Sequence, residues 1–261
     1  MKILVTVKEV AEPADDFEIS GLEIDEKYLE YDLNEWDDYA VEEAVQIQEE
    51  SDEDVEVVAV TIGPERSEET IRMALAKGAD RAVRVWSDEL EGEEILDPNA
   101  KAKILAEVAR EEDPDLIFTG VQADDDSIGA TGVALADQIG FEWAAVVNKF
   151  NLEDGSAYVH RELEGGVEEM TEVDLPAVFT IQTGINEPRY ASLRGIRQAQ
   201  SKEIAPKTLD DLGVTEEDIS TSLELTEMYE PESESDTEYI EGGAEQQADK
   251  LAEIFEDKGV V

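Results

Sequence analysis

The stretch GVQADDDSIGATG, residues 120–132, holds the residue types that most clearly suggest binding chemistry. Backbone N–H groups freed at a helix start, with Gly129, Thr131 and Gly132 permitting close approach, favour a bound phosphate. Three consecutive Asp residues disfavour a polyphosphate unless one of them caps the helix or binds a ribose hydroxyl. The stretch lacks the Lys of a Walker A loop and is no GxGxxG. An acidic capped turn without a ligand therefore stays open as the alternative.

A second stretch, INEPRYASLRGIRQAQ (185–200), has the composition of a docking surface. From residue 188 to residue 202 it contains no acid, although the 261-residue chain has a formal net charge of −49. It carries Arg189, Arg194 and Arg197, and arginine pairs carboxylates through two parallel hydrogen bonds. Such a patch can approach an anionic protein without like-charge repulsion.

Composition excludes several classes of chemistry. The chain has no Cys and a single His, His160, so disulfides, thiolate nucleophiles and Cys-ligated metal sites are excluded. We expect His160 to be an ordinary strand residue. The 69 Asp and Glu against 20 Lys and Arg are spread along the chain, while 41% of the residues are hydrophobic. This combination predicts a folded protein with an acidic surface, and it disfavours direct binding to nucleic-acid phosphates.

The same charge indicates the solvent in which the protein works. Molar salt shortens the Debye length to roughly 3 Å and screens most of the self-repulsion. We therefore expect an extreme halophile as the source, the alternative being an acidic protein of an ordinary cytoplasm. The opening MKILVTVKEV acquires charge too early for a signal peptide, and no run approaches 20 apolar residues. We expect a cytoplasmic protein.

The elements that must position these stretches alternate between strand and helix patterns. The candidate strands are 3–7, 55–63, 81–86 and 115–120. The candidate helices are 37–50, 67–79, 99–112 and 128–140. This order predicts an α/β protein with a Rossmann-like open parallel sheet flanked by helices. Ligands of such sheets bind beyond the carboxyl ends of the strands, here the loops beginning near Lys8, Gly63 and Gly120.

The pattern changes after residue 140. The turn signals Asp154-Gly155 and Gly165-Gly166 predict an antiparallel hairpin element, followed by a return strand over 175–181. From Lys202 onward the apolar content thins until a last helical pattern at 244–259. We therefore expect a nucleotide-binding domain over 1–200 and an extended C-terminal arm over 201–261 that packs on a partner.

The order of motifs resembles the small (beta) subunit of electron-transfer flavoproteins over essentially the whole chain. The matching segments are VKEV (7–10), AVEEAV (40–45), VVAVTIGP (57–64), ETIRMALAKGADRA (69–82), RELEGGVE (161–168), LPAVFT (175–180) and NEPRYASL (186–193). The region 165–199 covers the family's signature. The resemblance implies an electron carrier without catalytic residues or a metal. Its large (alpha) subunit binds the redox FAD, while this subunit holds a structural AMP.

The resemblance also implies two sets of site residues. AMP would contact Thr6, Asn34, Glu35, Trp36, Asp37, Ile62, Gly63, Asp125, Asp126, Ser127, Gly129, Ala130, Thr131, Gly132 and Ala136. Acyl-CoA dehydrogenases would dock on a recognition loop over about 182–202, through Arg189, Tyr190, Leu193, Arg194, Ile196 and Arg197. Leu193 matches the family's apolar anchor. Arg189 and Tyr190 can instead brace the loop against Glu162 or an alpha-subunit carboxylate. Electrons would leave through a membrane quinone reductase to the respiratory chain.

Departures from the family pattern keep two alternatives open. The usual Asp-Asp-Asp becomes Asp125-Asp126-Ser127, the usual Asn-Gln becomes Gly129-Ala130, and the Asn-Pro turn reads Asn34-Glu35. In electron-bifurcating relatives a second FAD replaces AMP, but Asp126 and Thr131 favour the AMP type. A stress-type nucleotide-binding protein would share the sheet and lack residues 165–199.

Overall fold

The computed structural model describes residues 1–91, 96–153, 155–221, 223–230, 237 and 239–259. The chain divides into two compact units, residues 1–227 and 228–261. Asp154, the first residue of one predicted turn, lies outside the described residues.

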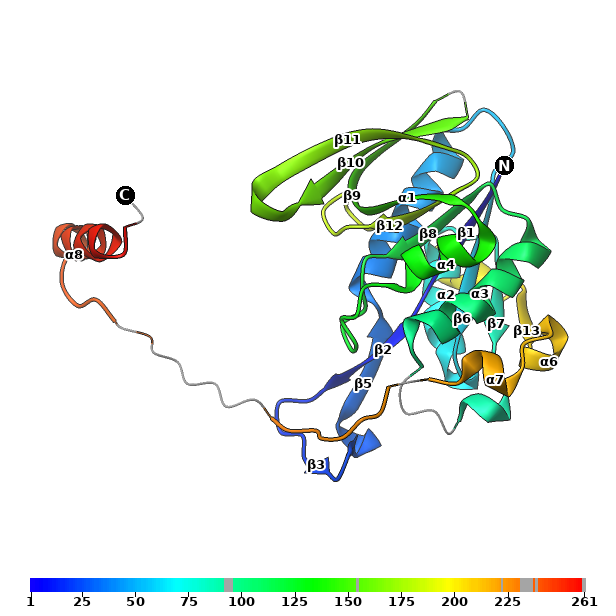
Figure 1. Cartoon of the computed structure of the whole chain (residues 1–261), viewed down its shortest axis with the longest axis horizontal. Coiled ribbons are helices and arrows are strands. Elements are labelled where there is room, and N and C mark those ends of the chain that lie inside the picture. The colour runs from blue at the N-terminus through cyan, green and yellow to red at the C-terminus, as the bar shows by residue number, and fades with distance from the viewer. Residues whose placement is uncertain (92–95, 154, 222, 231–236, 238, 260–261) are drawn as a thin grey trace. The chain divides into compact units, whose positions relative to one another are not determined.

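A central sheet organises the first unit, and its described strands follow the order β11-β10-β9-β12-β8-β1-β6-β7-β13 (Figure 1). The parallel strands are β1 (Lys2–Thr6), β6 (Glu56–Ile62), β7 (Arg81–Val85), β8 (Leu116–Gly120), β12 (Ala177–Ile181) and β13 (Ile204–Lys207). The β9 strand (Glu142–Glu153) runs parallel to β12 and antiparallel to β10 (Ser156–Leu163), which pairs with β11 (Val167–Asp174). The predicted fold class is confirmed.

Helices cover both faces of the sheet because alternate side chains of each central strand point to opposite sides. Ile3 and Val5 of β1 are buried with α1 (Glu35–Glu50) and α2 (Glu68–Lys77) on one face. Leu4 is buried with α3 (Pro98–Glu112) and α4 (Thr131–Ile139) on the other face. The four helices lie where the periodicity predicted them, within a few residues at each end.

The antiparallel element widens the sheet beyond β12. Gly155 lies between β9 and β10, and the short 3₁₀ turn η4 (Glu164–Gly166) joins β10 to β11. Phe150 of β9 packs edge-to-face against Phe118 and Phe179, with ring centroids 5.3 and 5.1 Å away. This aromatic contact joins the hairpin element to the core of the parallel sheet.

Several short elements carry no strong sequence pattern. Two antiparallel ribbons form from β2 (Glu9–Pro13) with β5 (Leu29–Leu33), and from β3 (Ile19–Ser20) with β4 (Glu23–Ile24). The short 3₁₀ turns η1 (Glu26–Tyr28), η2 (Glu65–Ser67) and η3 (Asp88–Leu90) lie in the connections between longer elements. Among the described residues three helices are short, namely α5 (Leu193–Ala199), α6 (Leu209–Leu212) and α7 (Glu216–Ile219).

The first unit extends past the expected boundary at residues 200 and 201. The β13 strand pairs with β7 at the sheet edge, and the following α6 and α7 bury Leu209, Leu212 and Ile219 against α3 and its neighbours. A four-residue strand and two one-turn helices have too short a periodic pattern to be recognised from sequence. The second unit contains the predicted terminal helix as α8 (Ala244–Asp257), on which Leu251 and Phe255 are partly exposed.

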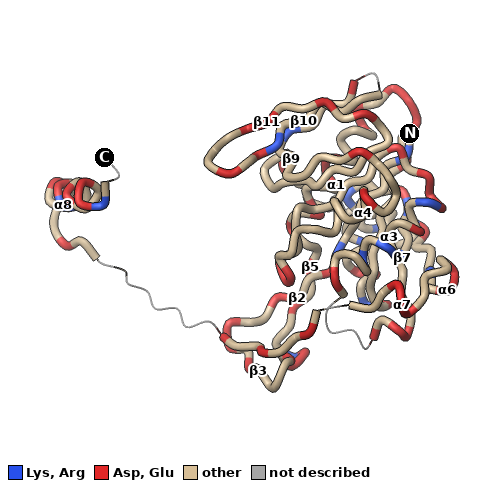
Figure 2. The backbone as a smooth tube through the Cα atoms, viewed as in Figure 1, with Lys and Arg blue, Asp and Glu red and all other residues tan. Residues whose placement is uncertain are grey.

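Charge is distributed as the sequence predicts. Acidic residues occur in helices, strands and loops of the first unit and again in α8 (Figure 2). Among the described residues, no helix is long and apolar enough to cross a membrane.

Candidate functional site

The sheet reverses its winding direction between β1 and β8. From β1 the chain proceeds outward through β6 and β7, whereas β8 is followed outward by β12. In open α/β sheets the crevice at such a switch point, beyond the carboxyl ends of the strands, is the usual ligand site. Thr6 ends β1 and Gly120 ends β8, so the structure places two of the predicted loops at this point. We call it the nucleotide edge.

A buried carboxylate joins the two strand ends. Asp37, in the first turn of α1, accepts hydrogen bonds from the backbone N–H of Lys8 at 2.8 Å and of Gly120 at 2.9 Å. Burial raises the pKa of Asp37 to about 7, because desolvation of the carboxylate outweighs the hydrogen bonds that favour its charged form. The predicted ligand residue Asp37 thus fixes the frame of the nucleotide edge.

Asn34, immediately before α1, supports the loop that follows β8. Its side-chain Nδ2 donates to the Gln122 carbonyl at 2.9 Å, and its Oδ1 accepts from the Asp124 N–H at 3.2 Å. Its own N–H donates to the Lys8 carbonyl at 3.0 Å. Asn34 therefore ties the loop over 121–130 to the end of β1, and its buried polar atoms are satisfied by the protein itself.

Two lysines pair with two of the three acidic residues of the loop. Lys8 contacts Asp125 at 2.5 Å and Asp126 at 3.0 Å, and Lys101 of α3 contacts Asp126 at 2.5 Å. Burial alone would raise the pKa of Asp126, but the hydrogen bond from Lys101 and the charges of both lysines lower it to about 2. These pairs remove the main objection to a phosphate beside three Asp residues. The sequence placed Lys8 at the start of an expected ligand loop but did not indicate its pairing with Asp125 and Asp126, and it gave no signal for Lys101.

The start of α4 leaves its first amides without a capping side chain. Ala130 precedes the helix and makes no side-chain cap, and the first turn contains no acid. Gly132 lies so close to the ends of β8 and β12 that a Cβ there would stand 2.5 Å from the Thr119 Oγ1. Glycine thus lets the helix start approach the strand ends. The first-turn N–H groups can therefore serve an anion.

The remaining predicted nucleotide residues fall into three groups. Ser127, Gly129 and Thr131 lie in or just after the loop, and Glu35 and Trp36 open α1. Ile62 ends β6, the strand beside β1, and Gly63 follows it. Ala136, on the buried side of α4, is in contrast fully buried in the core. The structure brings the residues of the loop, of the start of α1 and of the end of β6 to one edge of the sheet. Ala136 makes a packing contact instead.

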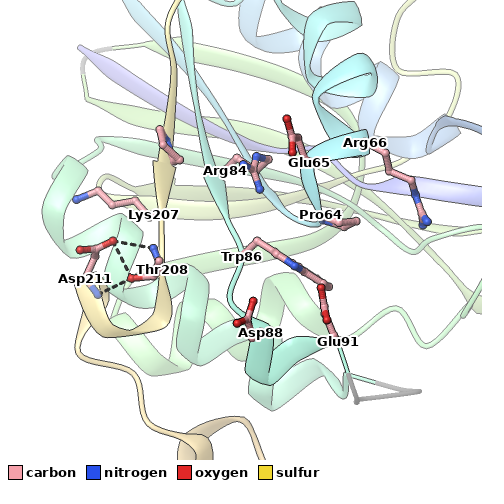
Figure 3. Close-up of a pocket in the computed structure, with 11 residues that line it drawn as sticks. Pro64, Glu65, Arg66, Arg84, Trp86, Asp88, Glu91, Lys207, Thr208 and Asp211 are labelled. Carbon is pink, nitrogen blue, oxygen red and sulfur yellow. Dashed lines mark hydrogen bonds between the residues drawn. The ribbon is translucent and has the colours of Figure 1, made fainter.

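A cleft of about 660 Å³ lies beyond the ends of β7 and β13 (Figure 3). Its lining residues are Pro64, Glu65, Arg66, Arg84, Trp86, Asp88, Glu91, Pro206, Lys207, Thr208 and Asp211. Its cations pair with acids: Arg66 with Glu9, Arg84 with Glu68 and Lys207 with Glu111. The loop that begins near Gly63, expected from the sequence to border a ligand, supplies Pro64, Glu65 and Arg66. The sequence did not indicate the other side of the cleft, where Arg84 lies in β7 and Trp86 follows it.

The recognition segment, residues 182–202, presents apolar and basic side chains to solvent. Tyr190 is 99% exposed and Leu193 79% exposed, and Ile196 lies on the exposed side of α5. Arg194 and Arg197 are exposed and form no ion pair within the described chain. The segment thus keeps the features of the predicted docking surface.

Arg189 behaves differently from the other arginines of the segment. It forms ion pairs with Glu42 at 2.8 Å and with Glu49 at 2.7 Å, both on α1. The hydrogen bonds that Arg189 donates to the carboxylates of Glu49 and Glu42 raise its pKa. The bracing interaction considered from the sequence is therefore present with α1 in place of Glu162. Glu42 and Glu49, 147 and 140 residues away, could not be found from local pattern.

Comparison with known proteins gives consistent matches. The family model described as the electron transfer flavoprotein domain matches residues 21–212. The chain is 47% identical to the electron transfer flavoprotein subunit beta of Methylophilus methylotrophus, covering 98% of both chains. It is 41% identical to the mitochondrial subunit beta of Oryza sativa subsp. japonica, over 88% of this chain and 90% of that one. The subunit beta of Bacillus subtilis is 30% identical over the full length of both.

Proposed function

The chain belongs to the electron transfer flavoprotein family as a beta subunit, and on this premise we propose that its recognition segment docks acyl-CoA dehydrogenases and its nucleotide edge holds AMP. Membership in the family implies a heterodimer with an alpha subunit and a flavin held by that heterodimer. Within it the chain acts as an electron-transfer subunit. We further propose that a membrane quinone reductase accepts the electrons, and that the acidic surface is adapted to molar salt.

One observation carries the docking proposal: a large apolar side chain is displayed on an acid-free segment of a strongly acidic protein. Leu193 begins α5 and is exposed, with Tyr190 and Ile196 beside it. Exposed apolar groups of this kind fill pockets on a partner, where they carry most of the binding free energy. Arg194 and Arg197 remain available for carboxylates around such a pocket.

The nucleotide proposal depends on the fit of the edge to a monophosphate. The uncapped first turn of α4 and the loop, in which two of three Asp residues are paired with lysines, can accept a phosphate, with the N–H groups near Gly129–Thr131 as donors. Thr6 and Ile62 end the adjacent strands, Gly63 follows Ile62, and all three would flank the nucleoside. AMP has no redox chemistry, so these residues bind and orient it, and the nucleotide contributes to the stability of the heterodimer.

Docking is tested on the heterodimer by the rate at which a reduced acyl-CoA dehydrogenase reduces its flavin. We expect Leu193→Ala to weaken docking by about 2 kcal/mol, roughly thirtyfold, because it removes an apolar anchor. Reduction by dithionite is the control, and flavin content should stay unchanged. Wild-type rates in the variant would mean that the segment is not the docking surface. Loss of flavin would assign Leu193 to the structural core.

Nucleotide content is tested by releasing and separating the bound nucleotides of the purified heterodimer. We expect one AMP and one FAD per heterodimer. Two FAD would instead identify an electron-bifurcating type, and FAD without AMP would mean that the loop over 121–130 is an acidic turn without a ligand.

A further inference from the structure

The projecting part of the recognition segment lies between two attachments to neighbouring helices. Tyr190 and Leu193 lie in this part and are exposed. Residues 182–189 contact α1 before it, and α5 contacts α2 after it. The two attachments differ in chemistry.

The first attachment is made by hydrogen bonds and ion pairs to α1. Trp36 Nε1 donates to Gln182 Oε1 at 2.9 Å, and Asn186 Nδ2 donates to Glu43 Oε2 at 2.9 Å. Arg189 then donates to Glu42 from its backbone N–H at 3.1 Å and from Nε at 2.8 Å. It is the last attached residue before Tyr190.

The carboxylates that hold Arg189 lie two helical turns apart on one face of α1. Nη1 and Nη2 of Arg189 donate to the two oxygens of Glu49 at 2.7 and 2.9 Å, and Nη2 also donates to Glu42 at 3.1 Å. The Glu42 side chain is buried, whereas that of Glu49 is exposed. Burial would raise the pKa of Glu42, but the hydrogen bonds from Arg189 and Gln46 lower it, so Glu42 is held as a carboxylate.

The second attachment is made by close packing and backbone contacts with α2. A Cβ on Gly195 would collide with the Ala76 carbonyl oxygen, so α5 lies directly against α2. Arg72 of α2 donates to the Ala199 carbonyl at 2.6 Å, and Lys202 donates to the Ala79 carbonyl at 2.6 Å. These contacts fix the end of the segment without using Arg194 or Arg197.

We propose that Glu42 and Glu49 are positioning residues for docking, because they hold Arg189 and thereby fix the projecting residues Tyr190 to Leu193 before a partner arrives. The inference rests on the proposed docking function. Rigid placement of a loop lowers the conformational entropy lost on binding, so it strengthens association without a direct contact. It also explains why one arginine of an acid-free segment has two acidic partners while Arg194 and Arg197 have none within the described chain.

The test measures flavin reduction in the heterodimer against the concentration of reduced acyl-CoA dehydrogenase. We expect Glu42→Gln to raise the KM for the dehydrogenase about tenfold and Glu49→Gln about threefold, since the buried partner makes the stronger charged hydrogen bonds. The rate at saturating dehydrogenase should stay within about twofold of wild type, because electron transfer after docking is not altered. A loss of rate at saturation with unchanged KM would overturn the proposal.

Glu50→Gln is the matched control. It removes the same charge from the next residue of α1, whose side chain is exposed, and we expect the wild-type KM. Glu49 is exposed, so Glu49→Gln keeps the fold and tests the proposal even if Glu42→Gln fails to fold. A KM for Glu49→Gln equal to that of Glu50→Gln would overturn the role of Glu49.

A double-mutant cycle separates positioning from a general structural effect. If Glu42 acts by placing Leu193, then Glu42→Gln should raise the KM less in a Leu193→Ala background than in the wild type. An equal increase in KM from Glu42→Gln in both backgrounds would overturn the proposal. An unchanged KM in Leu193→Ala alone would instead overturn the docking function, so the two failures are distinguishable.

Discussion

The nucleotide edge and the recognition segment use the few cations of this protein in opposite ways. At the nucleotide edge Lys8 and Lys101 are paired with Asp125 and Asp126, and the buried Asp37 is satisfied by backbone N–H groups. On the recognition segment, Arg194 and Arg197 are exposed without ion pairs in the described chain, beside exposed apolar side chains.

This difference in the pairing of cations indicates different roles for the two regions. Internal pairing fixes a frame, because these charged side chains are satisfied before any ligand binds. Unpaired cations and exposed apolar groups remain available for a second protein. Arg189 lies in the recognition segment, but it is paired internally, like the lysines of the nucleotide edge. Its ion pairs link the segment to α1. The same helix carries Asp37 at its start, so α1 supports both regions.

Salt should produce the largest effect and act on the whole molecule. Lowering KCl from molar concentration to dilute buffer should unfold the protein or dissociate the heterodimer, since a net charge of −49 loses its screening. Circular dichroism and flavin fluorescence across a salt series measure it. An equal melting temperature at both extremes would refute the adaptation to salt.

Asp37→Ala should break the frame of the nucleotide edge. The variant leaves the N–H groups of Lys8 and Gly120 without their acceptor, which should cost about 3 kcal/mol of unfolding free energy. Denaturation of the heterodimer at constant molar salt measures it, with the exposed Asp52→Ala as control. A loss no larger than that of the control would mean that water replaces the carboxylate.

Acid should weaken the pairing of Asp126 with Lys8 and Lys101. The folded-state pKa of Asp126 is about 2, below its ordinary value of 3.8. Its contribution of about 2 kcal/mol is therefore complete above pH 4 and is lost as the pH falls toward 2. The stability difference between wild type and Asp126→Asn, followed by denaturation from pH 6 to pH 3, should shrink. A constant difference would contradict the pairing with Lys8 and Lys101.

The stability contribution of Asp37 should depend on pH in the opposite direction to that of Asp126. Its folded-state pKa of about 7 lies above the ordinary value of 3.8, so the folded protein holds this proton more tightly than the unfolded chain. The resulting stabilisation is complete below pH 4 and is lost as the pH rises to about 7. Comparison of wild type with Asp37→Asn by denaturation at pH 5 and pH 8 measures it. The unfolding free energy of the wild type, relative to that of the variant, should be higher at pH 5 than at pH 8.

Reversing one unpaired charge should have the smallest effect. Arg197→Glu should slow flavin reduction by an acidic dehydrogenase about threefold in molar salt, where screening removes most of the long-range attraction. The effect should grow as salt is lowered within the range in which the protein stays folded. Arg110→Glu, which lies on α3, is the control. Equal rates in the two variants would remove Arg197 from the docking surface.

Local pattern predicted more of the fold than of the site. The strands β1, β6, β7 and β8 and the helices α1 to α4 were found because each is a periodic segment of sufficient length. The β13 strand and the helices α6 and α7 were missed because they are short and stabilised by the sheet edge and by α3. At the site, the loop over 120–132 was recognised from its small residues, whereas Lys101 lies on another helix and gave no signal.

By itself the sequence determined the alternation of elements, the turn positions, the acidic surface, the acid-free segment and the family. Only the tertiary structure decided which charges meet. Asp37 contacts Gly120 across 83 positions, Lys8 contacts Asp126 across 118, and Arg189 contacts Glu42 across 147. Periodicity and capping are properties of neighbouring residues, whereas these pairs depend on the order in which strands join the sheet and on the helix packed beside them. For that reason the sequence left Arg189 open as a partner contact or a brace of the loop, and the folded chain shows its ion pairs with α1.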